Sequence, residues 1–107
     1  MASFYKNAKV DLTGTGATIL YTAPAATTAI FKSLLVADDS GSTSTITVTI
    51  TDAAAAVFVV YNVKATAANG TLELLTQPLV VQESEILKVT AANANRLHVV
   101  GSFLEVT

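Results

Sequence analysis

The sequence predicts an all-β protein: a single antiparallel β-sandwich of about eight short strands, with jelly-roll or immunoglobulin-like topology. Apolar and β-branched residues alternate with polar ones at a period of two, and helical periodicity is hard to find. Turn residues interrupt these runs at short intervals. The length of 107 residues matches one domain, so we assign residues 1–107 to a single sandwich, with residues 1–12 as a candidate docking arm.

Two strands are predicted in the first third of the chain. Thr18–Tyr21 is β-branched and apolar, and it ends before Pro24 because proline cannot donate a hydrogen bond to a ladder. Ile30–Ala37 is apolar on both faces except at Lys32 and Ser33, which indicates a central strand.

Ser44–Thr51 has the clearest strand pattern. Ile46, Val48 and Ile50 share one face, and threonines occupy the other. This pattern is typical of an antiparallel strand with one buried face and one face that meets water or a partner. The polar stretch Asp38–Ser42 before it is predicted to be a hairpin loop.

The second half of the chain begins with an ambiguous alanine run and a strongly apolar strand. Ala53–Ala56 is predicted to be a loop or a single helical turn, because four residues are too few to nucleate a helix. Val57–Val63 contains neither charge nor proline and would promote aggregation if exposed. We therefore expect a central strand buried on both faces; the alternative is that one face or edge meets a partner subunit. Asn69-Gly70 predicts a type I′ hairpin turn, and the remaining strands are predicted at Thr71–Leu75, Leu79–Val81, Glu85–Ala91 and Leu97–Val106.

The composition indicates a surface shared with neighbours. Charged residues make up 13% of the chain, against about 25% in an average soluble domain. With a net charge of −2, a free monomer would have weak colloidal protection. We infer that neighbouring subunits cover part of the surface; the alternative is an ordinary threonine-rich monomer.

Charge and hydropathy patterns also bear on partners. The six basic residues are scattered and form no stripe that could neutralise phosphates, so we expect no nucleic-acid partner. The longest apolar run, Ala53–Tyr61, is too short to cross a bilayer as a helix. The first residues lack the apolar region of a signal peptide. We expect a protein made in the cytoplasm that does not bind membranes.

Candidate chemistry is sparse, and we predict that the chain is not an enzyme. His98 is the single histidine, it lies in an apolar strand, and no G-x-S-x-G nucleophile motif accompanies it. The close carboxylate pairs, Asp38 with Asp39 and Glu83 with Glu85, lie in or beside predicted loops, where charges are normally solvated. The sequence therefore predicts no catalytic, cofactor-binding or metal-binding residues.

Several segments together resemble a family of small virion structural proteins of tailed bacteriophages. In addition to the threonine-rich strand described above, the resemblance rests on Leu20–Ala25, Thr28–Ala37, Gln77–Val81, Ile86–Ala91 and Ser102–Thr107. It implies a non-enzymatic part of a phage particle: a decoration (cement) protein of the capsid, or an accessory of the neck, tail or fibres. It also implies symmetric homo-oligomers, dimers or trimers, located in the virion. Where this family often has Gly-Asp, the chain has Ser84-Glu85, which leaves the geometry of that turn open.

Four aromatic residues are the predicted interface residues. Phe4 and Tyr5 lie at a terminus that would fray unless docked, so we expect them to pack against the sandwich or a partner. Phe58 and Tyr61 belong to the apolar strand described above. A carbohydrate- or receptor-binding module is an alternative of another class. Sugar-binding sandwiches usually offer an aromatic platform, however, and this chain has no tryptophan.

Overall fold

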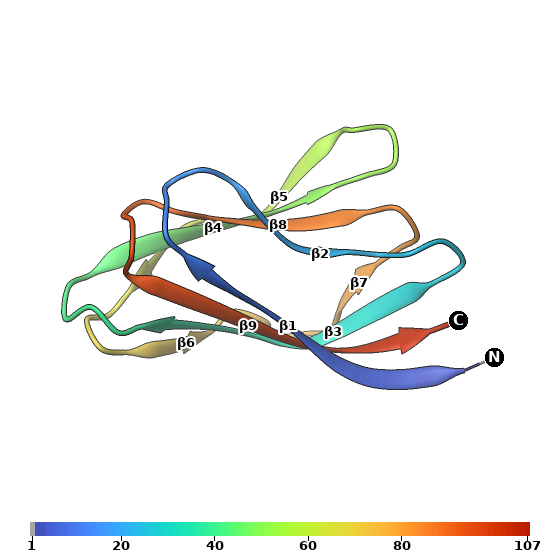
Figure 1. The fold of residues 1–107 in the computed structure, drawn as a ribbon, viewed down its shortest axis with the longest axis horizontal. Helices are drawn as coiled ribbons and strands as arrows, with labels where there is room; N and C mark the ends of the chain where they lie inside the picture. Colours follow the sequence, from blue (N-terminus) through green and yellow to red (C-terminus); the bar gives the residue numbers. More distant parts are fainter. Residues whose placement is uncertain (1) are drawn as a thin grey trace.

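The computed structural model describes residues 2–107 and is a sandwich of two antiparallel sheets (Figure 1). Sheet A contains β1 (Ser3–Leu12), β9 (Leu97–Val106) and β3 (Thr28–Asp38), and the far side of β3 pairs with both β6 (Thr71–Glu73) and β7 (Leu79–Val81). Sheet B contains, in spatial order, β2 (Thr18–Thr22), β8 (Ile86–Ala91), β4 (Ser44–Thr51) and β5 (Val57–Thr66). The predicted all-β sandwich is confirmed.

The strand order is that of a jelly roll. The chain pairs with itself in reverse order: β4 with β5, β3 with β6 and β7, β2 with β8, and β1 with β9. This long hairpin is rolled up, so that β9 also pairs with β3 and β8 also pairs with β4. Of the two predicted topologies, the chain therefore has the jelly roll rather than the immunoglobulin-like one.

Alternation along the central strands builds the core. Ile46 and Val48 of β4 are fully buried, as the sequence pattern predicts, while Thr47 between them is only half-buried. At one end of the core, three aromatic rings meet between the sheets. The ring of Phe31 stacks on that of Phe103 with centroids 4.6 Å apart, and Tyr21 from sheet B contacts both.

The amino-terminal segment forms a strand of sheet A in residues 3–12; residue 1 of the predicted docking arm lies outside the described residues. Residues 3–12 pair with β9 along their whole length, from Ser3 opposite Val106 to Leu12 opposite Leu97. Apolar and polar residues alternate only in Ala8–Leu12, and no strand was predicted from the sequence in residues 3–12. This strand is held in place by its ladder with β9, which lies at the other end of the sequence.

The two segments predicted to be hairpin turns, Asp38–Ser42 and Asn69-Gly70, do not form hairpins, so both predictions are wrong. Asp38–Ser42 connects β3 of sheet A to β4 of sheet B, and Asn69-Gly70 connects β5 of sheet B to β6 of sheet A. Asn69 has a φ of 55°, but Gly70 does not have positive φ, so the turn is not type I′. Local turn chemistry identifies a reversal of the chain, but it cannot tell whether the next strand returns to the same sheet.

The alanine run forms the one tight hairpin loop of sheet B, as the loop prediction required. Oδ1 of Asp52 accepts hydrogen bonds from the amides of Ala54 and Ala56, both at 2.9 Å. Ser84 occupies another tight turn with a φ of 68°, a conformation that glycine adopts at least cost. The glycine of the phage family pattern would suit this position.

A buried carboxylate joins the two sheets at the end of the sandwich where the termini lie. Glu105 is only 6% exposed and ends the inward-facing row of β9. The hydroxyl of Tyr21, from sheet B, donates to its Oε2 at 2.6 Å, and Nζ of Lys6 lies 2.8 Å from its Oε1. The hydrogen bonds from Lys6 and then Tyr21 lower the pKa of Glu105, although burial opposes them. Burial, and then the hydrogen bond to Glu105, raises the pKa of Tyr21.

We predict that this carboxylate makes stability depend on pH in acid. The folded-state pKa of Glu105 lies below its value in the unfolded chain, about 4.3. Its stabilisation is therefore fully present above that pH and is lost as the pH falls through the folded-state pKa. Glu105→Gln should lower the free energy of unfolding in urea by about 1–3 kcal/mol at neutral pH. The gap to the natural chain should narrow below about pH 4; a gap that stays constant would contradict this assignment.

We also predict that Gly101→Ala is destabilising. A Cβ at residue 101 would lie 2.7 Å from Cε2 of Phe31, and this ring is fully buried and stacked on Phe103. Such overpacking costs about 1–3 kcal/mol. Ser102→Ala, at the exposed neighbouring position, is the matched control and should change stability by less than about 0.5 kcal/mol. Urea unfolding measures both, and equal stabilities would show that the aromatic cluster can shift.

Candidate assembly surfaces

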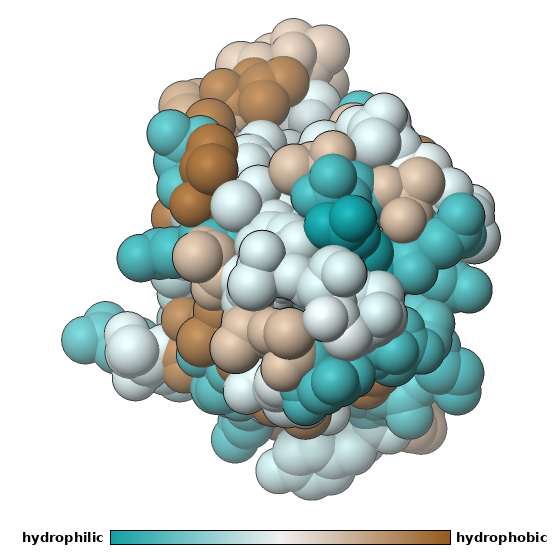
Figure 2. Space-filling view, turned by 90° about the vertical axis from the view of Figure 1, so that its left-hand side faces the viewer, coloured by the Kyte–Doolittle hydropathy of each residue, from teal (hydrophilic) through white to brown (hydrophobic). Residues whose placement is uncertain are grey.

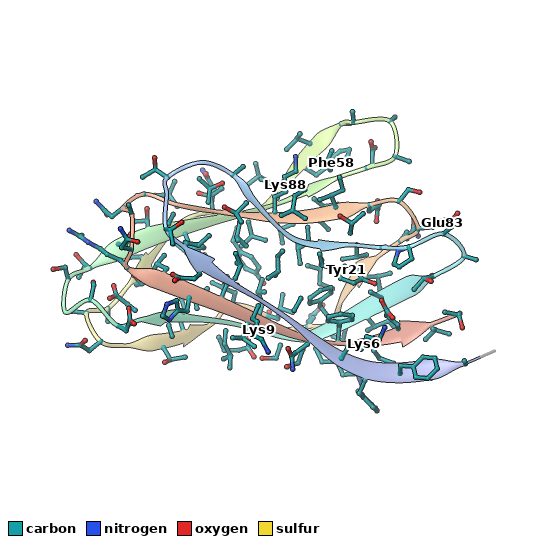
Figure 3. All side chains as sticks on the ribbon, in the orientation of Figure 1. Lys6, Lys9, Tyr21, Phe58, Glu83 and Lys88 are labelled. Atoms are coloured by element: carbon teal, nitrogen blue, oxygen red, sulfur yellow. The ribbon has the colours of Figure 1, made fainter. Side chains whose placement is uncertain are left out.

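The four predicted interface residues lie in two places. Phe4 and Tyr5 are in β1 of sheet A, 53% and 77% exposed, so their backbone is docked but their side chains are not in the core. Phe58 is in β5 of sheet B and is 57% exposed, whereas Tyr61 of the same strand packs against the core. Figure 3 shows Phe58 on the β4–β5 hairpin and Tyr21 inside the sandwich. The structure therefore does not bring the four residues together.

An apolar row crosses the outer face of sheet A. The register places Tyr5 opposite Leu104, Leu104 opposite Ile30, and Ile30 opposite Val80. These four residues, which we call the sheet A row, come from β1, β9, β3 and β7. Tyr5 and Val80 at its ends are exposed, and Leu104 and Ile30 are half-buried. Of these four residues, only Tyr5 was predicted from the sequence as an interface residue. The other three are brought next to it only by strand pairing.

A shallow hollow of about 410 Å³ lies beside the sheet A row. Nζ of Lys32 lies 5.9 Å from the centroid of the Tyr5 ring, which is within the range of a cation–π contact. The hollow is lined by Tyr5, Lys6, Asn7, Lys32, Ser102 and Phe103. It offers one exposed aromatic ring, that of Tyr5, with amide, hydroxyl and ammonium groups close to it.

The second apolar surface is the free edge of β5. The expectation that Val57–Val63 is a central strand is wrong, because β5 is the last strand of sheet B and pairs only with β4. We call its four exposed apolar residues the β5 edge; they are Val57, Phe58, Val59 and Val63, each 57–61% exposed. Figure 2 shows hydrophobic atoms gathered at the top of the molecule, where the β4–β5 hairpin lies in Figure 1. Apolar runs occur in central strands and in interface strands alike, so the sequence could not separate the two.

The later part of β5 is irregular. Its register with β4 shifts on both sides of Val48, so β5 has extra residues at these points. Val63 has a φ of 50°, which is unusual for a β-branched residue, and its amide donates to the hydroxyl of Thr47 at 3.1 Å. Regular pairing with β4 is therefore interrupted in the middle of β5, and it is found at Val57–Val59 at the hairpin end and again at Lys64–Thr66.

His98 lies between two aspartates on the surface of sheet A. Its Nε2 is 3.2 Å from Oδ1 of Asp11, and its Nδ1 is 3.7 Å from Oδ2 of Asp39. Side chains of all three residues are 45–62% exposed. The cluster links the end of β1, the start of β9 and the loop after β3. In the described part of the chain, no serine or threonine hydroxyl is hydrogen-bonded to His98.

One carboxylate of each predicted pair, Asp38 and Glu85, holds a turn. Asp38 is buried, which corrects the expectation of a solvated side chain. Its Oδ1 accepts hydrogen bonds from the backbone amide and from the hydroxyl of Ser40. The hydrogen bond from the backbone amide is the main reason why the pKa of Asp38 is lowered. Oε1 of Glu85 accepts a hydrogen bond from the amide of Gln82 at 2.7 Å.

Within residues 2–107, no three or more side chains of His, Cys, Asp or Glu lie close enough together to hold a metal ion. No helix in this range is long and apolar enough to cross a membrane.

Comparison of the sequence with models of known protein families and with curated proteins found no match.

Proposed function

We propose that this protein is a non-enzymatic structural component of a tailed-phage virion, a decoration protein that binds the assembled head and stabilises it. The observation that carries the proposal is the pair of separate apolar surfaces, the sheet A row and the β5 edge, on a chain with few charges. Exposed apolar patches commonly mark surfaces that contact other macromolecules. The jelly roll adds support, because viral capsid proteins are among the proteins built on it.

The sheet A row is the better candidate for the contact with the head. It lies on a sheet whose three long strands have 10 or 11 residues and pair along their whole length. Such a face is pre-organised, so binding orders few additional groups. Many weak contacts of this kind, repeated over a head, would hold adjacent capsid subunits together through avidity.

Two other roles use the same features. An accessory protein of the neck, tail or fibres would also need apolar contacts, and it would differ in copy number. A carbohydrate- or receptor-binding module is favoured by the exposed Tyr5 ring beside Asn7, Ser102 and Lys32, because sugars stack on aromatic rings and bind amides and hydroxyls. A structure with a bound glycan on Tyr5 would favour that role.

We predict that the purified protein saturates heads assembled without it and raises their resistance to heat. Co-sedimentation measures binding, and the temperature at which the heads release DNA measures stabilisation. A protein that ignores heads but occurs in a few copies per particle would indicate a neck or tail position. Its absence from all particles would contradict the virion proposal.

We further predict that the double variant Tyr5→Ser, Val80→Ser weakens head binding about tenfold or more, since both ends of the sheet A row lose apolar area. Both side chains are exposed, so urea unfolding should change little. Asn7→Ala is the matched control, because Asn7 lies on the same face of β1, one alternation from Tyr5. Equal binding by all three proteins would remove the sheet A row from the interface.

A further inference from the structure

The four edge regions of the sandwich differ in how they are protected against pairing with another chain. Natural proteins protect sheet edges with charges, bulges or very short strands. The β1 edge carries three charged residues, β2 has five residues with a register shift, and β6 and β7 have three residues each. In β5 the stretch Val57–Val59 has none of these features, and the register shifts begin only after it.

The position of this stretch leaves room for a partner. It follows directly from the β4–β5 hairpin loop, which rises away from the rest of the sandwich in Figure 1. In the described chain, the side of β5 away from β4 has no neighbouring strand. The backbone groups on that side are therefore available to extend sheet B by one strand.

We propose that this edge pairs with the same edge of a second copy of the chain, antiparallel and about a two-fold axis near Phe58, to form a continuous eight-stranded sheet from two B sheets. A two-fold axis brings each residue close to its own counterpart, so a charge near the axis would meet a like charge. From Ala53 to Val63 the chain has no charge. A second copy thus fits this neutral edge without an unpaired charge, and Val57 of each copy lies opposite Val59 of the other.

The proposed β5–β5 contact involves few residues, and its small area determines how strongly two copies associate. A short edge buries less surface than the roughly 1,600 Å² of a standard interface, so the dimer is weak and exchanges with the monomer in solution. On a particle, copies anchored side by side have a high effective concentration, and a weak edge contact becomes occupied. This inference deepens the proposed function, on which it rests for that consequence, because it assigns the β5 edge to self-association and leaves the sheet A row for the head.

Sedimentation equilibrium of the natural chain and two variants tests the proposal. Val59→Glu places like charges beside the two-fold axis and should abolish the concentration-dependent dimer. Ile19→Glu is the matched control, because Ile19 and Val59 are 55% and 57% exposed. The two residues also lie at opposite ends of one cross-strand row of sheet B, on β2 and β5. The control variant should dimerise like the natural chain. A natural chain that remains monomeric at about 1 mM, or a dimer that survives Val59→Glu, would overturn the proposal.

A cysteine variant tests the register independently. The chain has no cysteine, so Phe58→Cys introduces a single thiol next to the proposed axis. Directly opposite residues of antiparallel strands lie about 4.5–5.5 Å apart, within the range that a disulfide spans. Mild oxidation should cross-link Phe58→Cys at least tenfold faster than Ile19→Cys. Equal rates would show that residue 58 is not near an axis.

Head binding separates the two proposals. If Val59→Glu is monomeric but still binds heads, both stand. If the natural chain dimerises through β5 but ignores heads, the decoration role fails and the dimer stands. If the natural chain is monomeric and Val59→Glu loses head binding, the edge contacts the capsid, and the second-copy proposal is overturned.

Discussion

The pairing of β9 with β1 on one side and β3 on the other is the interaction on which the rest of the structure depends. Each ladder extends along nearly the whole of β9. The inward face of β9 supplies Leu97, Val99 and Phe103 to the core and ends in Glu105. Gly101 leaves the space that the ring of Phe31 fills. The same strand therefore orders the amino terminus, sets the aromatic cluster and positions the carboxylate that ties sheet A to Tyr21 of sheet B.

An open sandwich buries its inner faces but leaves its outer faces and edges exposed, and here the exposure is unequal. Apart from Phe4, Ile19 and Leu35, the exposed large apolar residues belong to the sheet A row and the β5 edge, which lie on different sheets. Two separate surfaces suit a protein that contacts one kind of neighbour through a face and another through an edge. Such a protein gains stability from its assembly as well as from its own small core.

Most residues of the two candidate surfaces, the sheet A row and the β5 edge, could not be predicted from the sequence. Tyr5 and Phe58 could be named because aromatic residues in uncharged or terminal segments are unusual when exposed. Ile30, Val80 and Leu104 could not, since each looks like an ordinary core residue in its own strand, and only the register places them side by side on an outer face. Tyr61 was predicted for the same reason as Phe58 but packs against the core. Tyr61 pairs with the fully buried Val48, whereas Phe58 pairs with Ile50 nearer the hairpin end and stays exposed.

The sequence by itself determined the all-β class, eight of the nine strands to within a few residues and the low charge, because alternation, turn residues and composition are local properties. It also determined that Ile46 and Val48 share a buried face. Only the tertiary structure decided the jelly-roll order, the strand formed by residues 3–12 and the edge position of β5. These depend on which strands lie next to each other. A two-residue period records which face of a strand is apolar, but it contains no information about the neighbour that will cover it.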